Sequence, residues 1–244
     1  MTVPKPPKKP PKAAVRQAKP PRRETPAARR VYGGIAAEQR VQERRERLLG
    51  TALELFATQG YQNTPIEQLC TEARVTTRHF YEAFAGREAL LLALYEKLIR
   101  EAQAAVRAEL QRPGLDLSER IPRVMHAFVE TYCSDRRRAQ IGVLEVVGVS
   151  PVVERRRREV IREFAQVLEG YADSLAAQGL LPQRDFHPVS LALVGGINEL
   201  LAEWLMSGHS AGLRKLQDEI SEVMQALLLG GVVLAQQARS TQKT

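Results

Sequence analysis

Residues 64–84 read TPIEQLCTEARVTTRHFYEAF, and this stretch decides the fold. Its first four residues have the types of a capping box with proline at the first helical position, so Thr64 and Glu67 are expected to bond each other's backbones. The apolar residues that follow have helical spacing, namely Ile66, Leu69, Cys70 and Ala73. The pattern predicts a short helix that ends near Arg74.

A second short helix is predicted to begin directly after Thr76. With Thr76 as its N-cap, Val75 and Phe80 occupy the two positions of a hydrophobic staple. At 100° per residue, Arg78 and Glu82 point away from the apolar stripe, which consists of Phe80, Ala83 and Phe84. Two short helices joined by a tight turn, with a polar outer face on the second, are typical of a helix-turn-helix.

The stretch from about residue 44 to 100 resembles the TetR family of transcriptional regulators. The matching positions are Leu48, Leu49, Ala52, Leu55, Phe56, Gly60, Tyr61, Thr64, Ile66, Leu69, Ala73, Val75, Thr76, Phe80, Tyr81, Phe84 and the run Arg87-Glu88-Ala89-Leu90-Leu91. The resemblance implies an all-α fold of about nine helices. Its helix-turn-helix head, residues 40–86, is joined by a long helix to a helical ligand-binding and dimerisation domain, residues 87–236.

The resemblance also implies which residues contact double-stranded DNA. Thr64 and Tyr81 match phosphate-contacting positions, and Arg87 matches a basic residue at the start of the fourth helix, where a helix N-terminus suits an anion. The positions that usually meet base edges are Thr76, Thr77, Arg78 and His79. His79 is alternatively a solvated helix residue.

The chain departs from the family pattern at two positions of this head. Arg74 stands where glycine is common, so the turn must hold a side chain, with a strained backbone as the expected result. Glu82 stands where the family often has a neutral or basic aromatic residue. Its carboxylate either accepts a hydrogen bond from cytosine N4 in the major groove or lies clear of the DNA.

The net charge of +8 over 244 residues comes from the N-terminus. Residues 1–30 hold ten basic residues and one acidic residue, and eight of the fourteen prolines lie in residues 1–26. We therefore predict a disordered basic arm, residues 1–36, and a flexible tail, residues 237–244. The rest of the chain is close to neutral, so its charge alone does not indicate nucleic-acid binding.

Apolar spacing, together with capping residues, prolines and glycines that begin or end helices, predicts seven helices besides the two short ones. Ser150 followed by Pro151 is an N-cap with proline at the first position, and Gly179 is placed to end the helix that follows. The expected ranges are about 41–58, 87–111, 117–132, 134–149, 151–178, 188–207 and 212–235. The run of four arginines from Arg155 to Arg158 is interpreted as a solvated helix surface that pairs with neighbouring glutamates.

The last two helices carry the pattern of a dimer interface. Five apolar residues in 213–227 have spacings of 3, 4, 3 and 4, as in a coiled coil, and residues 189–206 are apolar nearly all round. An intramolecular core is the alternative. The predicted homodimer residues are Leu191, Val194, Leu201, Leu205, Leu213, Leu216, Ile220, Val223 and Leu227. A dimer of such heads predicts a palindromic operator.

A pocket for an unknown small molecule is implied by the resemblance. Polar groups on apolar helices are the expected specificity contacts, because a pocket needs few convergent polar atoms. The candidates are Phe128, Tyr132, Leu144, Glu145, Phe164, Tyr171, Asn198 and Trp204, each of which would serve equally as core.

Other classes of protein lack support in the sequence. The sequence contains no catalytic motif and no metal-ligand spacing, so we expect no cofactor. It also contains no uninterrupted apolar run long enough to span a membrane. Two isolated cysteines and the absence of a secretory signal indicate the cytoplasm. The sequence thus predicts a ligand-released repressor, with an architectural, nonspecific DNA-binding protein driven by the basic arm as the alternative.

Overall fold

The computed structural model describes residues 1–2, 26–207 and 212–241. Its described part is helical throughout and contains no strand, as the sequence predicts. The elements are α1 (Pro26–Gln59), α2 (Ile66–Ala73), α3 (Thr77–Ala83), α4 (Arg87–Leu110), α5 (Leu117–Cys133), α6 (Arg136–Ala139), the π-helix η1 (Gln140–Glu145), α7 (Pro151–Ala177), α8 (His187–Met206) and α9 (Leu213–Thr241).

The chain forms two compact units, Met1–Arg40 and Val41–Thr244. Helix α1 begins at Pro26 rather than near Val41, so residues 26–36 of the predicted arm are helical. The last proline of the leader stands at the first helical position, and alanines and arginines follow it, which favours a helix. The predicted disorder otherwise concerns residues 3–25, which lie outside the described residues.

The predicted tail is also shorter than expected. Helix α9 continues to Thr241, so residues 237–241 belong to the helix, and residues 242–244 lie outside the described residues. No glycine or proline follows Gly231 to end the helix earlier.

The core of the head is built from α1 to α4. Leu48, Phe56, Leu69 and Phe80 are all 0% exposed, and the rings of Phe56 and Tyr61 meet edge to face with centroids 5.3 Å apart. Thr76 caps α3 by accepting a hydrogen bond from the His79 backbone N–H at 3.3 Å, as predicted. A seven-residue helix gains little from its own hydrogen bonds, so the cap and the burial of Phe80 are what stabilise it.

The predicted capping box at Thr64 is wrong. Helix α2 begins at Ile66 with Pro65 as its N-cap, and no side chain caps it. Thr64 is instead fully buried and donates its hydroxyl to the Gly60 carbonyl at 2.8 Å. A capping box does occur at the start of α5, where Asp116 accepts from Glu119 N–H and the Glu119 carboxylate accepts from Asp116 N–H.

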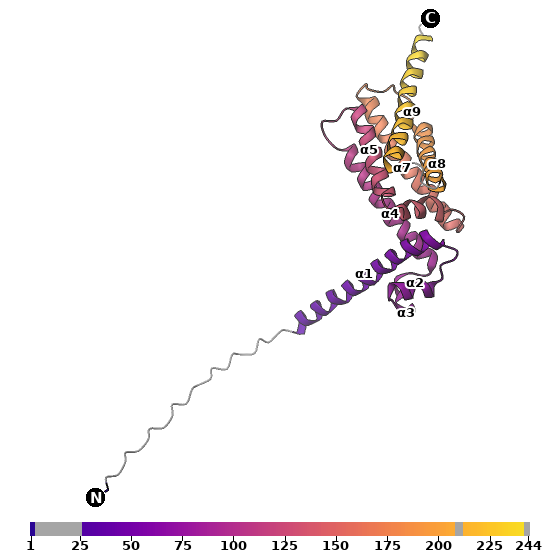
Figure 1. Ribbon diagram of the computed structural model, residues 1–244. Coiled ribbons are helices and arrows are strands. Elements are labelled where there is room, and N and C mark those ends of the chain that lie inside the picture. The colour runs from indigo at the N-terminus through magenta and orange to yellow at the C-terminus, as the bar shows by residue number, and fades with distance from the viewer. Residues whose placement is uncertain (3–25, 208–211, 242–244) are drawn as a thin grey trace. The chain divides into compact units, whose positions relative to one another are not determined.

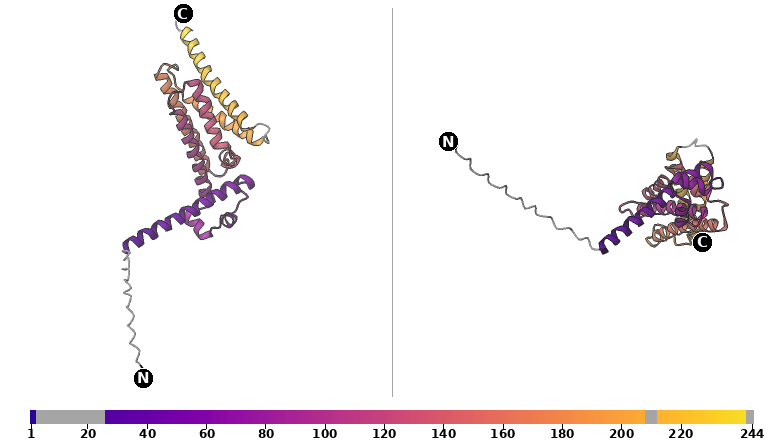
Figure 2. Two further views of the ribbon diagram at one scale, coloured as in Figure 1. Left: turned by 60° about the vertical axis from the view of Figure 1, so that its left-hand side comes forward. Right: turned by 90° about the horizontal axis from the view of Figure 1, so that it is seen from below.

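Helices α4, α5, α7, α8 and α9 form the helical domain of the second unit (Figures 1 and 2). Helix α5 packs on both α4 and α9, and α7 packs on α8. Ser150 caps α7 by accepting from the Val153 N–H at 3.2 Å, and Gly179, with φ of 76°, follows its end, as the sequence predicts.

Helix α8 is, among the described residues, the one helix long and apolar enough to cross a membrane by length and composition. The sequence predicts no such helix, because charged residues interrupt the apolar run. In the structure α8 is a core helix of this domain. Its buried residues are Ser190, Leu193, Ile197, Leu201, Ala202, Trp204 and Leu205.

The helix predicted for residues 134–149 is broken into two parts. Four residues of α-helix, α6, lead into six residues of π-helix, η1, and the Val146 N–H donates to the Ile141 carbonyl five residues back. Within η1, Gly142 packs closely on α5: a Cβ there would be 1.5 Å from the Tyr132 hydroxyl oxygen. The tyrosine of α5 occupies the space that a side chain on η1 would need.

The backbone strain expected at Arg74 is present. Arg74 has φ of 53° and ψ of 47°, the only positive φ among the non-glycine residues that the structure describes. Its N–H donates to the Thr71 carbonyl and the Val75 N–H to the Cys70 carbonyl, so this conformation ends α2 and turns the chain into α3.

Replacing Arg74 with glycine should stabilise the protein. A left-handed conformation costs a non-glycine residue about 1 kcal/mol or more. Glycine avoids this cost but loses more conformational entropy on folding, which offsets part of the gain. We expect Arg74→Gly to raise the free energy of unfolding by roughly 0.5–1 kcal/mol, measured in urea. Arg74→Ala, which keeps the strain, is the control. Equal stabilities of the two variants would contradict this account.

Adding a methyl group at Gly142 should have the opposite effect. Gly142→Ala places a Cβ against the buried Tyr132 ring, and such overpacking costs about 1–3 kcal/mol. Gly170→Ala is the matched control, because no heavy atom lies within 4 Å of the added Cβ in the middle of α7. We expect the control to stabilise by roughly 0.5–1 kcal/mol. Thermal unfolding of both variants tests the pair, and a neutral Gly142→Ala would refute the tight contact.

Candidate functional site

Helix α3 presents a polar face with four exposed side chains. Arg78 and Glu82 point away from the buried Phe80, and Thr77 and Tyr81 lie on the flank beside them, the Tyr81 ring meeting the Phe80 ring edge to face with centroids 5.4 Å apart. Arg78 is 87% exposed and pairs with Glu82 through Nε at 3.0 Å. The guanidinium is therefore held outward along the helix, available to a ligand that approaches this face.

Thr76 and His79 support this face as well as belong to it. The Thr76 hydroxyl lies 2.8 Å from His79 Nδ1, in addition to capping α3. His79 is half-buried, and its Nε2 lies 4.0 Å from Glu82. The two residues are thus tied to the helix itself, and the less constrained candidates for base contact are Thr77 and Arg78.

Arg87 has a structural role in addition to any contact with phosphate. Its guanidinium lies 4.4 Å from the centre of the Tyr61 ring and donates to the carbonyls of Gln62 and Thr64 at 3.3 and 2.9 Å. It therefore fixes the loop between α1 and α2 to the start of α4. Thr64, whose hydroxyl is buried and bonded to Gly60, is not available to a phosphate through its side chain.

A second arginine secures the far end of α3. Arg45 of α1 lies over the Phe84 ring at 4.3 Å from its centre and donates to the Ala83 carbonyl at 3.1 Å. This is a carbonyl of the last turn of α3, where a cation also interacts favourably with the helix dipole.

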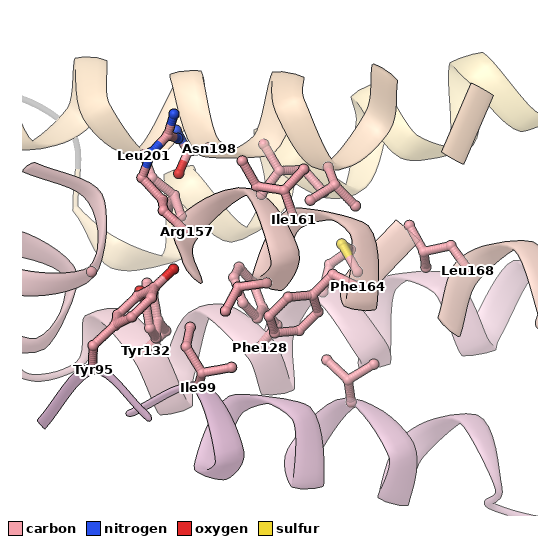
Figure 3. Close-up of a pocket in the computed structure, with 16 residues that line it drawn as sticks. Tyr95, Ile99, Phe128, Tyr132, Arg157, Ile161, Phe164, Leu168, Asn198 and Leu201 are labelled. Atoms are coloured by element: carbon pink, nitrogen blue, oxygen red, sulfur yellow. The ribbon is translucent and has the colours of Figure 1, made fainter. Parts of the chain in front are cut away.

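An apolar pocket lies inside the helical domain (Figure 3). The space between its lining residues is about 710 Å³, part of it open to solvent, and only about 70 Å³ is wide enough for a water molecule. The pocket is therefore narrow, and a ligand of substantial size would have to push side chains aside. Its lining residues are Tyr95, Ile99, Val106, Met125, Phe128, Tyr132, Gly142, Arg157, Val160, Ile161, Phe164, Leu168, Val194, Ile197, Asn198 and Leu201.

The polar side chains of the pocket gather toward one end. In Figure 3, Arg157, Asn198, Tyr95 and Tyr132 are drawn on one side of the view and Leu168 on the other. Burial raises the pKa of both tyrosines well above the ordinary value, so their hydroxyls remain neutral donors. Within the described part of the chain, the two hydroxyls and the Asn198 amide have no hydrogen-bond partner.

Arg157 is the one charged side chain among the lining residues. Its Nε and Nη2 each donate to Glu154 at 3.0 Å, while Nη1 makes no hydrogen bond to any described residue. Hydrogen bonds from Arg157 and Arg158 lower the pKa of Glu154 to about 2, so the carboxylate is ionised at neutral pH. The pocket therefore holds a paired arginine with one amino group still free to bind an anion or a carbonyl.

Half of the predicted pocket residues lie elsewhere. Phe128, Tyr132, Phe164 and Asn198 line the pocket, whereas Leu144 packs against the core beside it and Trp204 is buried in the core. Tyr171 lines a separate, smaller cavity. Glu145 points to the head: its Oε2 accepts a hydrogen bond from the Tyr61 N–H at 2.9 Å, and its Oε1 accepts from Gln140 at 3.0 Å.

Arg157 and the residues of α4 were not among the pocket residues predicted from the sequence. The arginine run was interpreted as solvated, and its ion pairs to Glu154 and Glu159 do form. Arg156 and Arg157, however, are partly buried, and Arg156 also reaches Glu96 of α4. The side chains of α4 that line the pocket, Tyr95, Ile99 and Val106, have helical spacing, which could have indicated a shared face.

The predicted dimer residues divide into two groups. Leu201, Leu205, Leu216 and Ile220 are no more than 3% exposed within one chain, so assigning them to an interface was wrong. The coiled-coil-like spacing of α9 partly reflects its packing on α5 and α8. Leu191, Val223 and Leu227 are exposed at 39%, 38% and 42%, while Val194 and Leu213 are half-buried, with Val194 at the pocket.

The cysteines and histidines give no sign of metal or redox chemistry in the described residues. No group of three or more His, Cys, Asp or Glu side chains there could hold a metal ion. Cys70 and Cys133 are buried and unpaired, and burial raises the pKa of Cys133 to about 12. Such thiols are poor nucleophiles.

Comparisons with known proteins agree with this architecture. Residues 48–94 match the family model described as bacterial regulatory proteins, tetR family. The HTH-type transcriptional regulator AcrR of Shigella flexneri is 27% identical over 202 residues, which are 79% of this chain and 93% of that protein. Such relatives are transcriptional regulators, not enzymes.

Solved structures share the fold at low identity. The fatty acid degradation regulator FadR from Bacillus halodurans superposes with a TM-score of 0.67 at 19% identity, over 76% of this chain and 94% of that one. FadR from Bacillus subtilis in complex with stearoyl-CoA gives 0.65 at 18% identity, over 75% and 97%. The family model over the head, the regulators that the chain resembles along most of its length and the shared fold together support a TetR family regulator.

Proposed function

We propose that this regulator is a cytoplasmic homodimeric repressor that binds a palindromic operator through α3 and is released by an amphipathic small molecule. The observation that carries the proposal is the combination of two features in one unit: an exposed Thr77, Arg78, Tyr81 face on a tightly held helix, and a narrow pocket with polar groups at one end.

The α3 face is suited to the major groove. An α-helix fits that groove, and an outward arginine can donate two hydrogen bonds to a guanine. Because Glu82 already holds Arg78, the pair fixes the direction of the guanidinium before DNA arrives. The hydroxyl of the exposed Tyr81 is placed to reach a phosphate beside the groove.

A dimer surface on α8 and α9 is supported by apolar residues that one chain leaves exposed. These are Leu191 and Met206 on α8 and Val223 and Leu227 on α9, with Gly195 and Gly196 also exposed between the first two. Small residues permit close approach of a second helix, and exposed apolar patches mark interaction sites. We infer half-sites about 34–36 Å apart, or a multiple of this distance.

The ligand class follows from the pocket. Most lining residues are apolar, and the unsatisfied groups of Tyr95, Tyr132 and Asn198 lie with the free Nη1 of Arg157 toward one end. A molecule with an apolar chain and a carboxylate or thioester head would satisfy these groups and bury its chain. The likeness to a regulator solved with stearoyl-CoA supports this choice.

A short path joins the pocket to the head. Tyr132 lines the pocket and lies against Gly142 of η1, and Glu145 at the end of η1 accepts the hydrogen bond from Tyr61. A ligand that displaces the Tyr132 ring would therefore change the packing of η1 and the position of Glu145. Tyr61 and Arg87 in turn hold the loop before α2, so we propose that ligand entry alters the setting of α3 by this route.

Substitutions in α3 should separate base reading from phosphate binding. After selection of bound fragments from random DNA, Arg78→Ala should lose about 5–150-fold in operator affinity and relax the preference at one position of each half-site. Tyr81→Phe should weaken all DNA sites alike. Fluorescence anisotropy with matched and mismatched duplexes measures both effects.

Two controls complete this experiment. Arg155→Ala removes the same charge from an exposed position on α7 and should leave base preference unchanged. Deleting residues 1–25, which precede α1, should lower affinity for every DNA and reduce its salt dependence. If the truncated protein binds random and selected DNA equally, the architectural alternative is correct, and unchanged base preference in Arg78→Ala would refute the α3 assignment.

Glu145 should be required for release but not for ligand binding, because it does not line the pocket. We expect Glu145→Ala to bind operator and ligand while losing most of the ligand-induced drop in operator affinity, which is typically about 5–150-fold in such proteins. The assay compares operator affinity with and without the fatty acid or acyl-CoA that gives the largest thermal shift.

Glu145→Gln is the matched control, since its amide oxygen still accepts from the Tyr61 N–H. We expect it to keep most of the response. A full response in Glu145→Ala would exclude this path from pocket to head.

A further inference from the structure

A second cavity lies next to the ligand pocket. The space between its lining residues is about 340 Å³, part of it open to solvent, and only about 20 Å³ is wide enough for a water molecule; it shares one lining residue, Leu168, with the larger pocket. Its remaining lining residues are Tyr171, Ala172, Leu175, Phe186, Val189, Ser190, Leu193 and Met224. Leu168 therefore stands between two hollows, not at the closed end of one.

Two antiparallel helices line both cavities in sequence. Along α7, the residues at intervals of four and three are Arg157, Ile161, Phe164, Leu168, Tyr171 and Leu175, so one helix face passes from the charged end of the pocket to the far cavity. Figure 3 shows the first four of them in this order. On α8 the order is reversed: Leu201, Asn198 and Val194 line the pocket, and Leu193, Ser190 and Val189 line the cavity.

The packing of the domain is also divided at this place. Ala172, Leu175, Ala176, Leu181 and Phe186 form a small hydrophobic cluster separate from the main core. The second cavity is lined by this cluster on one side and by Leu193 and Met224 of the main core on the other. A chain that enters between the two hydrophobic clusters would have to push apart only the side chains where these clusters meet.

We propose that the two cavities form one channel for a straight apolar chain and that Leu168 divides it and sets the chain length. This inference rests on the ligand class proposed above. Eleven residues of helix separate Arg157 from Leu168, about 16 Å, and eighteen separate it from Leu175, about 27 Å. An extended alkyl chain advances about 1.25 Å per carbon, given tetrahedral carbons about 1.5 Å apart.

These lengths give a specific expectation. With its head at Arg157, a chain of about twelve carbons ends at Leu168, and a chain of sixteen or eighteen carbons ends in the second cavity. Leu168 is a specificity residue: the wild-type protein prefers the shorter chains, and removing its side chain opens the way to the longer ones.

The test measures binding against chain length. Saturated fatty acids and, in a separate series, acyl-CoAs of eight to eighteen carbons are titrated into the full-length wild type and Leu168→Ala. Each buried methylene adds about fourfold in affinity, so affinity should rise with length, stop rising near twelve carbons in the wild type and continue to about sixteen or eighteen in Leu168→Ala. The two series show whether the head is a carboxylate or a thioester.

A second variant shows that the gain comes from the far cavity. Ala172 lines that cavity only, so Leu168→Ala combined with Ala172→Leu should return the optimum to about twelve carbons, and thermal unfolding confirms that each variant is folded. If affinity depends on chain length in the same way in the wild type and in Leu168→Ala, the proposal that Leu168 limits the chain length is wrong. Failure of both proteins to bind any member of either series would instead overturn the proposed ligand class.

Discussion

Burial of Phe80 is the constraint on which the DNA-reading half depends. A helix of seven residues does not persist in water on its own hydrogen bonds, and α3 exists because this ring is fully enclosed by the core of the head while Thr76 closes its first turn. The same burial orients the helix, since Arg78 then points away from the core and Tyr81 lies on the flank, with its ring against that of Phe80. The packing that stabilises α3 therefore also determines which of its side chains are exposed.

Arginine side chains connect elements that apolar packing alone would leave loosely related. Arg45 joins α1 to the end of α3, Arg87 joins the loop before α2 to α4, and Arg156 joins α7 to Glu96 on α4. Each contacts either an aromatic face and backbone carbonyls or more than one carboxylate, so planar geometry and several donors are used at once. Two of these contacts lie in the head, and the third joins two helices that line the pocket, α4 and α7.

The six-residue π-helix η1 contains both a residue that lines the pocket, Gly142, and a residue that contacts the head, Glu145. The Tyr132 ring packs against Gly142, where no side chain would fit, and the Glu145 carboxylate accepts a hydrogen bond from the Tyr61 N–H. Irregular helical segments of this kind are common at functional sites because they present backbone and side chains in directions that a regular helix does not. Here the irregular segment contacts a pocket residue, Tyr132, and a residue of the head, Tyr61.

The helix-turn-helix, the all-helical class, most helix ends and the strain at Arg74 could be predicted from the sequence, because caps, staples and apolar spacing act within a few residues. The residues that line the pocket could not, since Arg157 and Tyr95 lie on different helices and meet only after these helices pack. The tertiary structure also assigned Leu216 and Ile220 to the interior of one chain, a choice that spacing cannot make because intramolecular and intermolecular seams have the same period. Glu145 and Thr64 were misassigned for a similar reason: their partners, Tyr61 and Gly60, depend on where the surrounding chain lies in space.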